Sequence, residues 1–315
     1  MLDLRRLVLL CEFARRGSIA ATATYLGYSA SAVSQQLAEL EREAGTALLD
    51  RTARSAELTD AGRRLVGHAE QILSLVEEAK SDLSSHGNIP SGRVVVTAFP
   101  TGAIAFAPIL ARALRRYEQL TLRMRQGHAQ NAIRDVQSGD ADIALIDIWD
   151  NDAVERNSST LRFFPLLHDP LVLVLPSDHA LAESTNIIDV ATLRNENWMA
   201  APAGEPSRIH FDRLIGAVDG EPPDILWEFE GLGALLVLVS EGLGIAVVPG
   251  LTLAAGVGGI AVRHLPTSHT GRVVLAVVRR ASIKRPAVSV TLKALHGAAR
   301  ELAGEIESVS LAYRY

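Results

Sequence analysis

Apolar side chains recur at helical spacing from the start of the chain, and the breaks between them divide the first 45 residues into three helices. Gly17 ends the first helix, and Ser18 is placed to cap the second, over residues 20–26. A third helix follows Ser29 and ends at Gly45. The inward stripes of the first and third helices are expected to be Leu4, Leu7, Val8, Cys11 and Ala14, and Val33, Leu37, Leu40 and Ala44.

The outward face of the third helix carries short polar side chains near its N-terminal end, namely Ser31, Ser34, Gln35 and Ala38. In the major groove glutamine pairs with adenine, serine pairs with several bases, and small residues permit close approach, so this stripe suits base reading. A plain solvated face is the alternative interpretation. Two extended pieces over 48–51 and 52–58 then predict a β-wing, on which Arg51 and Arg54 are candidate phosphate or minor-groove contacts.

From residue 58 onward the apolar positions alternate between spacings of four and three, which is a heptad seam of about three and a half repeats. The breaker sequence over 87–92 separates this helix from the rest of the chain and leaves the seam without an obvious partner there. We therefore predict a dimerising linker helix; an amphipathic helix packed on its own domain is the alternative. The seam comprises Gly62, Leu65, Ala69, Ile72, Val76, Ala79 and Leu83.

The remaining two thirds of the chain alternates buried strands with helices, which predicts parallel α/β sheets in two subdomains. The first series has strands over 93–99, 120–126 and 142–147 and helices over 100–117 and 131–138. The second has strands over 171–175, 198–201, 225–230 and 245–248, with one helix beginning at 207 and another ending at 241. A strand over 272–278 and a long amphipathic helix over 286–306 complete the pattern.

Composition narrows the class of protein. A length of 315 residues suggests two domains, and 48% hydrophobic with 21% charged residues is typical of soluble globular chains. No stretch reaches the roughly 18 apolar residues of a membrane span, and the N-terminus forms an amphipathic helix rather than a signal peptide, so we expect a cytoplasmic protein without membrane contact. The lone Cys11 lies on an apolar stripe, and we assign it to core packing.

The charge balance and the missing motifs exclude several functions. A net charge of −5 argues against nonspecific coating of nucleic acid, and residues 1–64 hold nine arginines against eight acidic residues, so any DNA contact depends on placement. No metal-ligand spacing, dinucleotide fingerprint or nucleophile elbow occurs. We therefore expect neither a cofactor nor an enzyme.

The N-terminal motifs resemble those of the LysR-type transcriptional regulators, in unbroken order over some sixty residues. They are 17–23 (GSIAATA), 26–29 (LGYS), 32–37 (AVSQQL), 40–41 (LE), Gly45, 48–51 (LLDR) and 58–62 (LTDAG). Similar family runs stand at 139–142 (GDAD), 175–182 (LPSDHALA) and 241–249 (EGLGIAVVP), so the resemblance covers nearly the whole chain.

This resemblance implies an α/β protein with an N-terminal all-α winged helix-turn-helix and a two-lobed effector domain like the periplasmic binding proteins. The expected domains are a winged helix-turn-helix over 1–58, a linker helix over 59–87, and an effector domain over 92–315. Its first lobe would take 92–166 and 267–304, and its second lobe 167–266, with crossings near Pro165 and Pro266.

We expect DNA contacts from the third helix, the turn before it, and the wing. The family's usual glutamine after the serine at 29 is replaced by Ala30, which removes one common base-edge hydrogen bond and favours a larger share of shape readout. Leu49 stands where the family usually has phenylalanine. The candidate residues are Ser18, Ser29, Ala30, Ser31, Ser34, Gln35, Arg51, Arg54 and Ser55.

A small-molecule effector is expected between the lobes, where helix N-termini favour anions or polar groups. Thr101 and Ser207 are candidate caps at two such helices, and Glu230, if it faces the site, would favour a cationic or hydroxyl-bearing effector. Surface, sheet-end and plain capping roles are the alternatives for these side chains. The candidate residues are Pro100, Thr101, Gly102, His128, Ile148, Trp149, Ala201, Pro202, Ser207, Phe229 and Glu230.

The partners implied are a double-stranded DNA operator, a small-molecule effector, a second copy of the chain in a dimer or tetramer, and, as a further candidate, RNA polymerase. Three other classes of protein are the rivals. An enzyme lacks the motifs above, and a secreted solute receptor would leave the N-terminal helices unexplained. A C-terminal domain that only assembles oligomers, without sensing, is compatible with the sequence.

Overall fold

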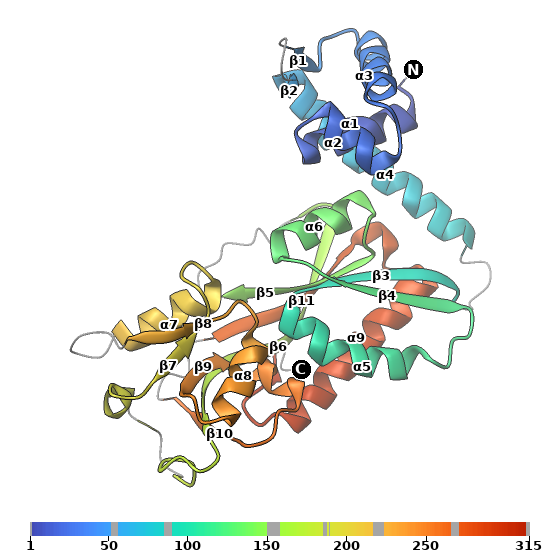
Figure 1. Cartoon of the computed structure of the whole chain (residues 1–315). Helices are drawn as coiled ribbons and strands as arrows, with labels where there is room; N and C mark the ends of the chain where they lie inside the picture. The colour runs from blue at the N-terminus through green and yellow to red at the C-terminus, as the bar shows by residue number, and fades with distance from the viewer. Residues whose placement is uncertain are drawn as a thin grey trace. The chain divides into compact units, whose positions relative to one another are not determined.

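The computed structural model describes residues 2–51, 56–84, 90–149, 158–184, 188, 190–216, 224–265 and 271–312. The chain divides into two compact units (Figure 1). The first comprises Met1–Gly87 with Arg279–Arg285, and the second comprises Asn88–Val278 and Pro286–Tyr315. No helix in the described part of the chain has the length and apolar character needed to cross a membrane.

The first unit is a helical bundle with a two-stranded wing, as predicted. Each of its first three helices ends at a glycine in the left-handed conformation, Gly17, Gly27 and Gly45, which a side chain would strain. The elements are α1 (Leu4–Arg16), α2 (Ile19–Leu26), α3 (Ala30–Ala44), β1 (Leu49–Arg51), β2 (Ala56–Leu58) and α4 (Asp60–Ser84). The strands β1 and β2 pair antiparallel, with Leu49 opposite Leu58.

The buried face of α1 differs from the predicted stripe. Leu7 and Cys11 are buried as expected, but Leu4 and Val8 are exposed. Because α1 contacts α2, α3 and α4, a wide part of its surface is buried. This buried surface includes Leu9, Leu10 and Phe13, which the apolar spacing did not predict to be buried. Burial raises the pKa of the Cys11 thiol to about 12, which fits a packing role.

The heptad seam of α4 has two different environments. Ala69 is fully buried and Leu65 packs beside it in the core of the first unit, so the alternative of packing on its own domain is correct for this half. Gly62 lies so close to the Leu48 carbonyl that a β-carbon would stand 2.2 Å from that oxygen. Ile72 is 38% exposed. The side chains of Ala79 and Leu83 lie outside the described residues.

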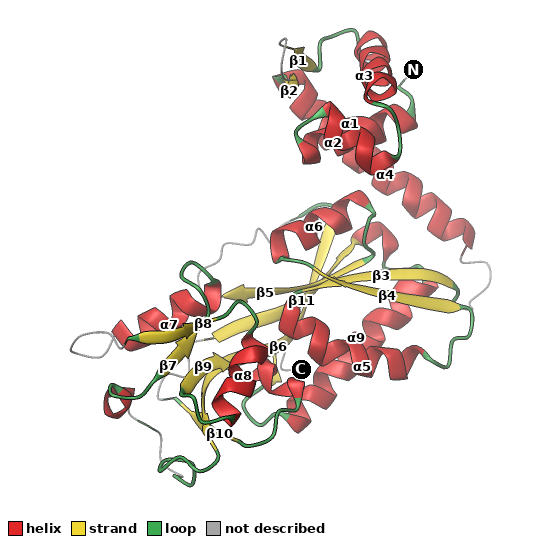
Figure 2. Cartoon of the chain, in the orientation of Figure 1, coloured by secondary structure: helices red, strands yellow, loops and turns green. Residues whose placement is uncertain are grey.

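The second unit is built on a mixed sheet of ten strands, with helices on its faces (Figure 2). Its strand order is β4-β3-β5-β11-β6-β9-β7-β8, and β10 and β12 pair with β6. The strands are β3 (Gly92–Ala98), β4 (Leu120–Gln126), β5 (Ile143–Trp149), β6 (Leu161–Pro176), β7 (Trp198–Ala200), β8 (Ile225–Glu228), β9 (Ile245–Pro249), β10 (Ile260–His264), β11 (Gly271–Arg279) and β12 (Ser310–Leu311). The helices are α5 (Pro100–Leu114), α6 (Ala129–Ser138), α7 (Pro206–Gly216), α8 (Leu232–Ser240) and α9 (Pro286–Glu305), with 3₁₀ turns η1 (Val190–Leu193), η2 (Gly250–Ala255) and η3 (Arg280–Ser282).

Most of the predicted parallel pairs are present, since β3 lies parallel to β4 and β5, and β7 lies parallel to β8 and β9. The strand expected over 171–175 is an exception, because it runs antiparallel to β9. The short partners β10 and β12 were missed, because they pair with β6 rather than with a sequence neighbour. The strand expected over 171–175 is much longer, and β6 connects the two series of strands beside β11. Gly271 permits this approach, because a β-carbon there would lie 2.6 Å from the Pro170 Cα.

Candidate DNA-reading face and effector site

The N-terminal end of α3 presents the predicted polar stripe to solvent. Ser29 caps the helix, and its hydroxyl accepts a hydrogen bond from the Ala32 N–H at 3.2 Å. Ser31 and Gln35 are exposed, whereas Ser34 is half-buried. Ala30, at the first position of the helix, is also exposed. Because Val33, Leu37 and Leu40 are buried, this face is fixed by the core behind it.

Arg51, on β1, reaches back to α3. Its guanidinium donates to the Ser34 hydroxyl at 2.9 Å and pairs with the Glu41 carboxylate at 3.3 Å. Glu41 also accepts the backbone N–H groups of Leu48 and Leu49, which fixes the start of the wing to the helix. The predicted base-reading and phosphate-binding side chains are therefore in contact. Arg54 and Ser55 lie outside the described residues.

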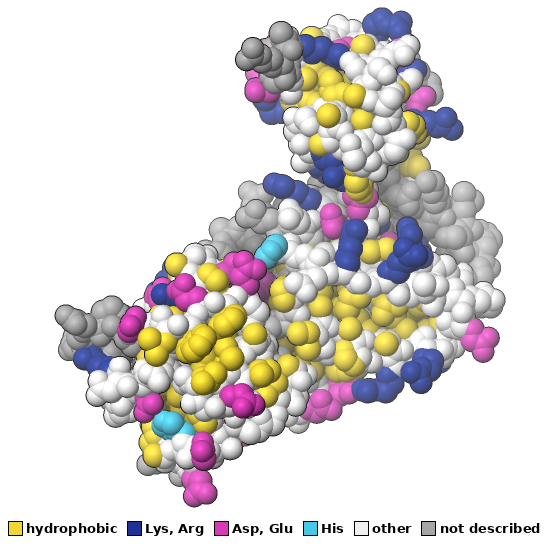
Figure 3. All heavy atoms as spheres, viewed as in Figure 1, with side chains coloured by type: hydrophobic (Ala, Val, Ile, Leu, Met, Phe, Trp, Pro, Cys, Tyr) yellow, Lys and Arg dark blue, Asp and Glu magenta, His cyan; other side chains and the backbone are white. Residues whose placement is uncertain are grey.

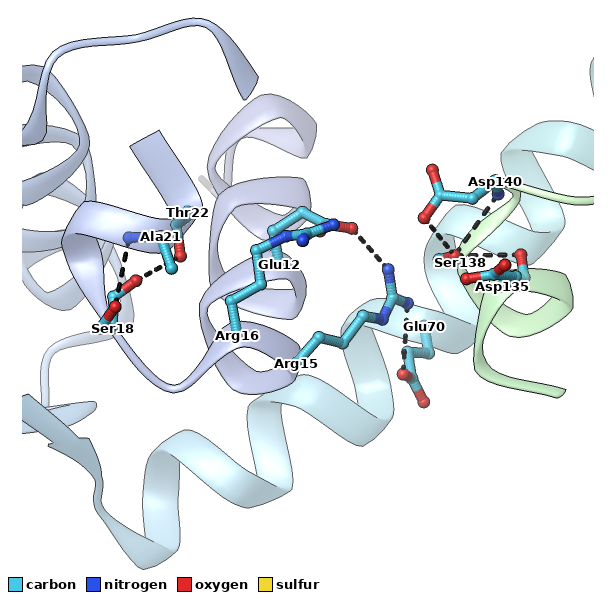
Figure 4. Close-up of polar contacts among 10 residues, drawn as sticks. All are labelled: Glu12, Arg15, Arg16, Ser18, Ala21, Thr22, Glu70, Asp135, Ser138 and Asp140. Carbon is cyan, nitrogen blue, oxygen red and sulfur yellow. Dashed lines mark hydrogen bonds and ion pairs between the residues drawn. The ribbon is translucent and has the colours of Figure 1, made fainter. Parts of the chain in front are cut away.

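Ser18 serves as the cap of α2, as its position predicted. Its hydroxyl accepts the Ala21 N–H at 3.1 Å, and its carbonyl accepts the Thr22 hydroxyl (Figure 4). Nearby in the same unit, the buried Glu12 carboxylate pairs with Arg15 and Arg16. The Ser18 side chain therefore already has a structural role.

In the second unit, the predicted site residue Thr101 belongs to a buried polar cluster around Arg272. The Arg272 guanidinium donates to the Thr101 hydroxyl at 2.6 Å, to Asp147 at 3.0 Å and to Asp169 at 2.8 Å. The Phe99 ring lies over the same guanidinium, 4.7 Å from its central carbon. The Arg272 side chain is 4% exposed and that of Asp169 is fully buried, so this is an ion-pair network removed from water.

Asp169 connects this cluster to the 3₁₀ turn after β9. Its second oxygen accepts the Leu251 N–H at 2.7 Å. Burial raises the pKa of the Asp169 carboxyl above its usual value, while the Arg272 guanidinium and the Leu251 N–H act in the opposite direction. The cluster thus joins α5, β5, β6, β11 and η2 through one arginine.

Trp149, at the end of β5, is 4% exposed and lies beside this cluster. Its indole N–H donates to Asp147 at 3.1 Å, and its ring lies 5.5 Å from the Arg272 guanidinium carbon. On α7, the His210 ring packs against Trp149 with ring centroids 4.6 Å apart. Trp149 therefore connects β5, in the first series of strands, with α7 of the second series, and its role is not limited to covering the end of a sheet.

The prediction that Thr101 and Ser207 cap the N-termini of two helices is wrong. Phe99 occupies the N-cap of α5 with no side-chain cap, and Thr101 lies inside the first turn, facing Arg272. The helix α7 begins at Pro206, so Ser207 also lies within the first turn. In both cases a proline one residue earlier starts the helix, because its fixed φ suits the first position.

The other predicted effector residues are distributed over several environments. Gly102 is buried, and a β-carbon there would lie 2.7 Å from the Phe99 ring, so the glycine allows that ring to pack. Ile148 and Ala201 are buried, and Pro202 is half-buried. Pro100, His128, Phe229 and Glu230 are exposed. Within the described residues, no group of three or more His, Cys, Asp or Glu side chains is arranged to hold a metal ion.

Comparison with known families decides the identity. The family described as "LysR substrate binding domain" matches residues 87–300, and "Bacterial regulatory helix-turn-helix protein, lysR family" matches residues 4–63. The chain belongs to the LysR family. It is a DNA-binding transcriptional regulator with an effector-binding domain, not an enzyme.

Curated relatives of this LysR-family regulator are also regulators. The transcriptional regulator CbbR of Xanthobacter flavus is 30% identical over 255 residues, which cover 81% of this chain and 74% of that protein. The regulator CysL of Bacillus subtilis is 27% identical over 221 residues, covering 70% of this chain and 71% of the relative. These relatives agree with the assignment made from the helix-turn-helix motifs.

Solved structures show the same fold. A full-length variant of OxyR from Pseudomonas aeruginosa aligns with a TM-score of 0.69 at 19% identity, covering 95% of this chain and 97% of that one. The LysR-family regulator CbnR aligns with a TM-score of 0.53 at 20% identity, covering 93% and 100%. The mixed α/β architecture behind an N-terminal helix-turn-helix is thus shared.

Sequence reasoning missed four side chains of the buried cluster: Asp147, Asp169, His210 and Arg272. Asp147, Asp169 and Arg272 stand within largely apolar strands, and a charged residue in such a strand is a signal of an internal partner. The partners of Arg272 are 103 to 171 residues distant in sequence, so the pattern could not identify them.

Proposed function

We propose that this regulator reads its operator with the N-terminal face of α3 and holds the DNA backbone with the wing. The exposed Gln35, on a helix fixed from behind by Val33, Leu37 and Leu40, is the observation that carries this proposal. A glutamine amide can make two hydrogen bonds to adenine in the major groove. Ser31 and the turn at Ser29 and Ala30 accompany it at the same end of the helix.

Arg51 couples the two kinds of contact. In the free protein its guanidinium is held by Ser34 and Glu41, which places a cation beside the reading face. A DNA phosphate offers stronger, charge-assisted hydrogen bonds than the neutral serine hydroxyl. Release of Ser34 from Arg51 would then leave the serine free to contact a base.

The functional protein is proposed to be a dimer, or a tetramer of two dimers, with paired DNA-binding domains. The exposed Ile72 on α4 supports this, because the seam continues past the part that packs internally. Large apolar side chains are also exposed on α5 and α8, including Ile104 and Val237, and in Figure 3 hydrophobic side chains gather over both helices. RNA polymerase is proposed as a further partner.

We assign effector sensing to the boundary between two lobes, residues 92–166 with 267–304 and residues 167–266. Arg272 and Asp169 lie on opposite sides of this boundary and are joined by a hydrogen bond, as Trp149 and His210 are joined by their rings. An effector that favours one arrangement of the lobes would shift the population of that arrangement. A reversal from 1:99 to 99:1 requires a preference of roughly 10⁴-fold.

Operator binding tests the proposal. Fluorescence anisotropy with DNA from the intergenic region beside the gene, combined with footprinting, gives affinity and base preference. Gln35→Ala should lose about 5- to 150-fold in affinity and relax discrimination at particular base pairs. Arg42→Ala is the matched control, because Arg42 is 73% exposed at the other end of α3. Unchanged affinity and base preference in Gln35→Ala would reject α3 as the reader.

A further inference from the structure

His210 carries a buried hydrogen-bond acceptor that the described residues leave unused. Its Nδ1 lies 2.9 Å from the Pro206 carbonyl oxygen, which can only accept, so Nδ1 holds the proton of the neutral ring. The other nitrogen, Nε2, therefore keeps its lone pair. It is buried and has no hydrogen-bond partner within the described part of the chain. Native proteins rarely leave such an atom unpaired without a functional reason.

The neighbouring polar hydrogens are already engaged. The Trp149 indole N–H donates to Asp147, although its ring packs against His210. Arg272, whose guanidinium carbon lies 5.5 Å from the Trp149 ring, donates to Thr101, Asp147 and Asp169. Within the described residues no side chain supplies a partner for Nε2, and a bound molecule with an O–H or N–H group would supply one.

We propose that His210 Nε2 accepts a hydrogen bond from an O–H or N–H group of the effector, and that this effector is an uncharged, partly apolar molecule. The inference rests on the proposed effector-sensing role of the second unit. It adds the chemical class of the effector and the residue that recognises its polar group.

The electrostatics of the cluster disfavour an anionic effector. Asp147 and Asp169 set two carboxylates against the single Arg272 guanidinium, whose hydrogen bonds are directed at them and at Thr101. Burial is the largest cause of the raised pKa of the Asp169 carboxyl, and the Asp147 charge is a smaller one that acts in the same direction. A carboxylate effector would add to it, and it would also place its acceptor oxygens against the acceptor Nε2.

The apolar side chains beside His210 favour an effector whose remaining part is also apolar. The Trp149 ring packs against the His210 ring, with centroids 4.6 Å apart, so an aromatic side chain borders the imidazole. Because Nε2 is buried and the His210 ring packs against Trp149, an effector bound at Nε2 would alter the contact between α7 and the end of β5. Binding at His210 is thus linked to the arrangement of the two lobes.

Three matched probes test this chemistry on the full chain: phenol, toluene and benzoate. Phenol offers an O–H donor, toluene keeps the ring without the donor, and benzoate replaces the donor with an anion. In histidine labelled with ¹⁵N, the His210 Nε2 resonance should shift with phenol and not with toluene or benzoate. Phenol should bind about tenfold more tightly than toluene, as one hydrogen bond to a buried acceptor allows.

Two variants separate recognition from packing. His210→Phe keeps an aromatic ring and removes the acceptor, so the preference for phenol over toluene should vanish. His264→Phe, at an exposed histidine on β10, should keep it. If His210→Phe does not fold, the wild-type Nε2 resonance alone decides. A larger shift with benzoate than with phenol, or no shift with phenol at concentrations that preserve the fold, overturns the inference. Operator binding is measured separately, so its loss would count against the proposed function and not against this recognition.

Discussion

The DNA-reading face and the Arg272 cluster are built in opposite ways. The reading face is exposed and uses residues that are neighbours in sequence, such as Ser29 and Ser31, with Arg51 only 17 residues from Ser34. The Arg272 cluster is buried, and its partners lie 103 to 171 residues away. Substitutions at an exposed site can leave the fold intact, whereas substitutions in a buried network affect both ligand binding and the stability of the fold.

The largest expected effect breaks the buried network. Arg272→Ala leaves Asp147 and Asp169 facing each other without their cation, and breaking a buried ion pair costs about 3–5 kcal/mol. Urea unfolding of the second unit, followed by circular dichroism, measures the loss. Arg112→Ala is the matched control, because Arg112 pairs with Glu301 at the surface, and it should cost less than about 1 kcal/mol. Equal losses in the two variants would contradict the contrast between buried and exposed charge.

The two environments of α4 give the next prediction. Ala69→Asp places a carboxylate in the core of the first unit and should reduce its stability by more than about 3 kcal/mol. Ile72→Asp, one turn further at an exposed position, should leave the fold intact and instead yield smaller species in sedimentation with weaker operator binding. If Ile72→Asp sediments as the wild type does, the exposed part of the seam is not the dimer contact.

A smaller effect is expected from a single methyl group on α4. Gly62→Ala would force its β-carbon against the Leu48 carbonyl, and such overpacking costs about 1–3 kcal/mol. Gly67→Ala meets no atom within 4 Å on the same helix, so it should stabilise the helix by about 0.5–1 kcal/mol. Thermal unfolding compares the two, and a stabilising Gly62→Ala would show that the wing does not approach α4 this closely.

The smallest effect on stability is expected at the wing. Arg51 is 36% exposed, so Arg51→Ala should change stability by less than about 1 kcal/mol. Operator binding should nevertheless weaken to a similar extent for all sequences, and the slope of log affinity against log salt should fall by about one. Titrations at several salt concentrations test this. A variant that loses base discrimination with an unchanged salt slope would assign Arg51 to base reading.

Short-range features of this fold were available from the sequence. The glycine stops at 17, 27 and 45 and the serine caps at 18 and 29 are local events, because the residues that satisfy the helix ends are one turn away. The spacing of Val33, Leu37 and Leu40 was sufficient to orient α3 and its polar face. In the same way, alternating strands and helices identified the α/β class.

Tertiary packing decided the points that periodicity left open. It turned the buried face of α1 away from Leu4 and Val8, because three helices surround it, and it divided the α4 seam between the core at Ala69 and the surface at Ile72.

Tertiary packing also determined the surroundings of the predicted effector residues. Thr101 was identified as a candidate cap at a helix N-terminus, but its partner Arg272 is 171 residues away. The sequence by itself therefore determined the helices, the exposed polar face of α3 and the family. Only the folded structure could bring Arg272, Asp147, Asp169 and His210 together, because burial of charge depends on contacts between distant strands and not on local spacing.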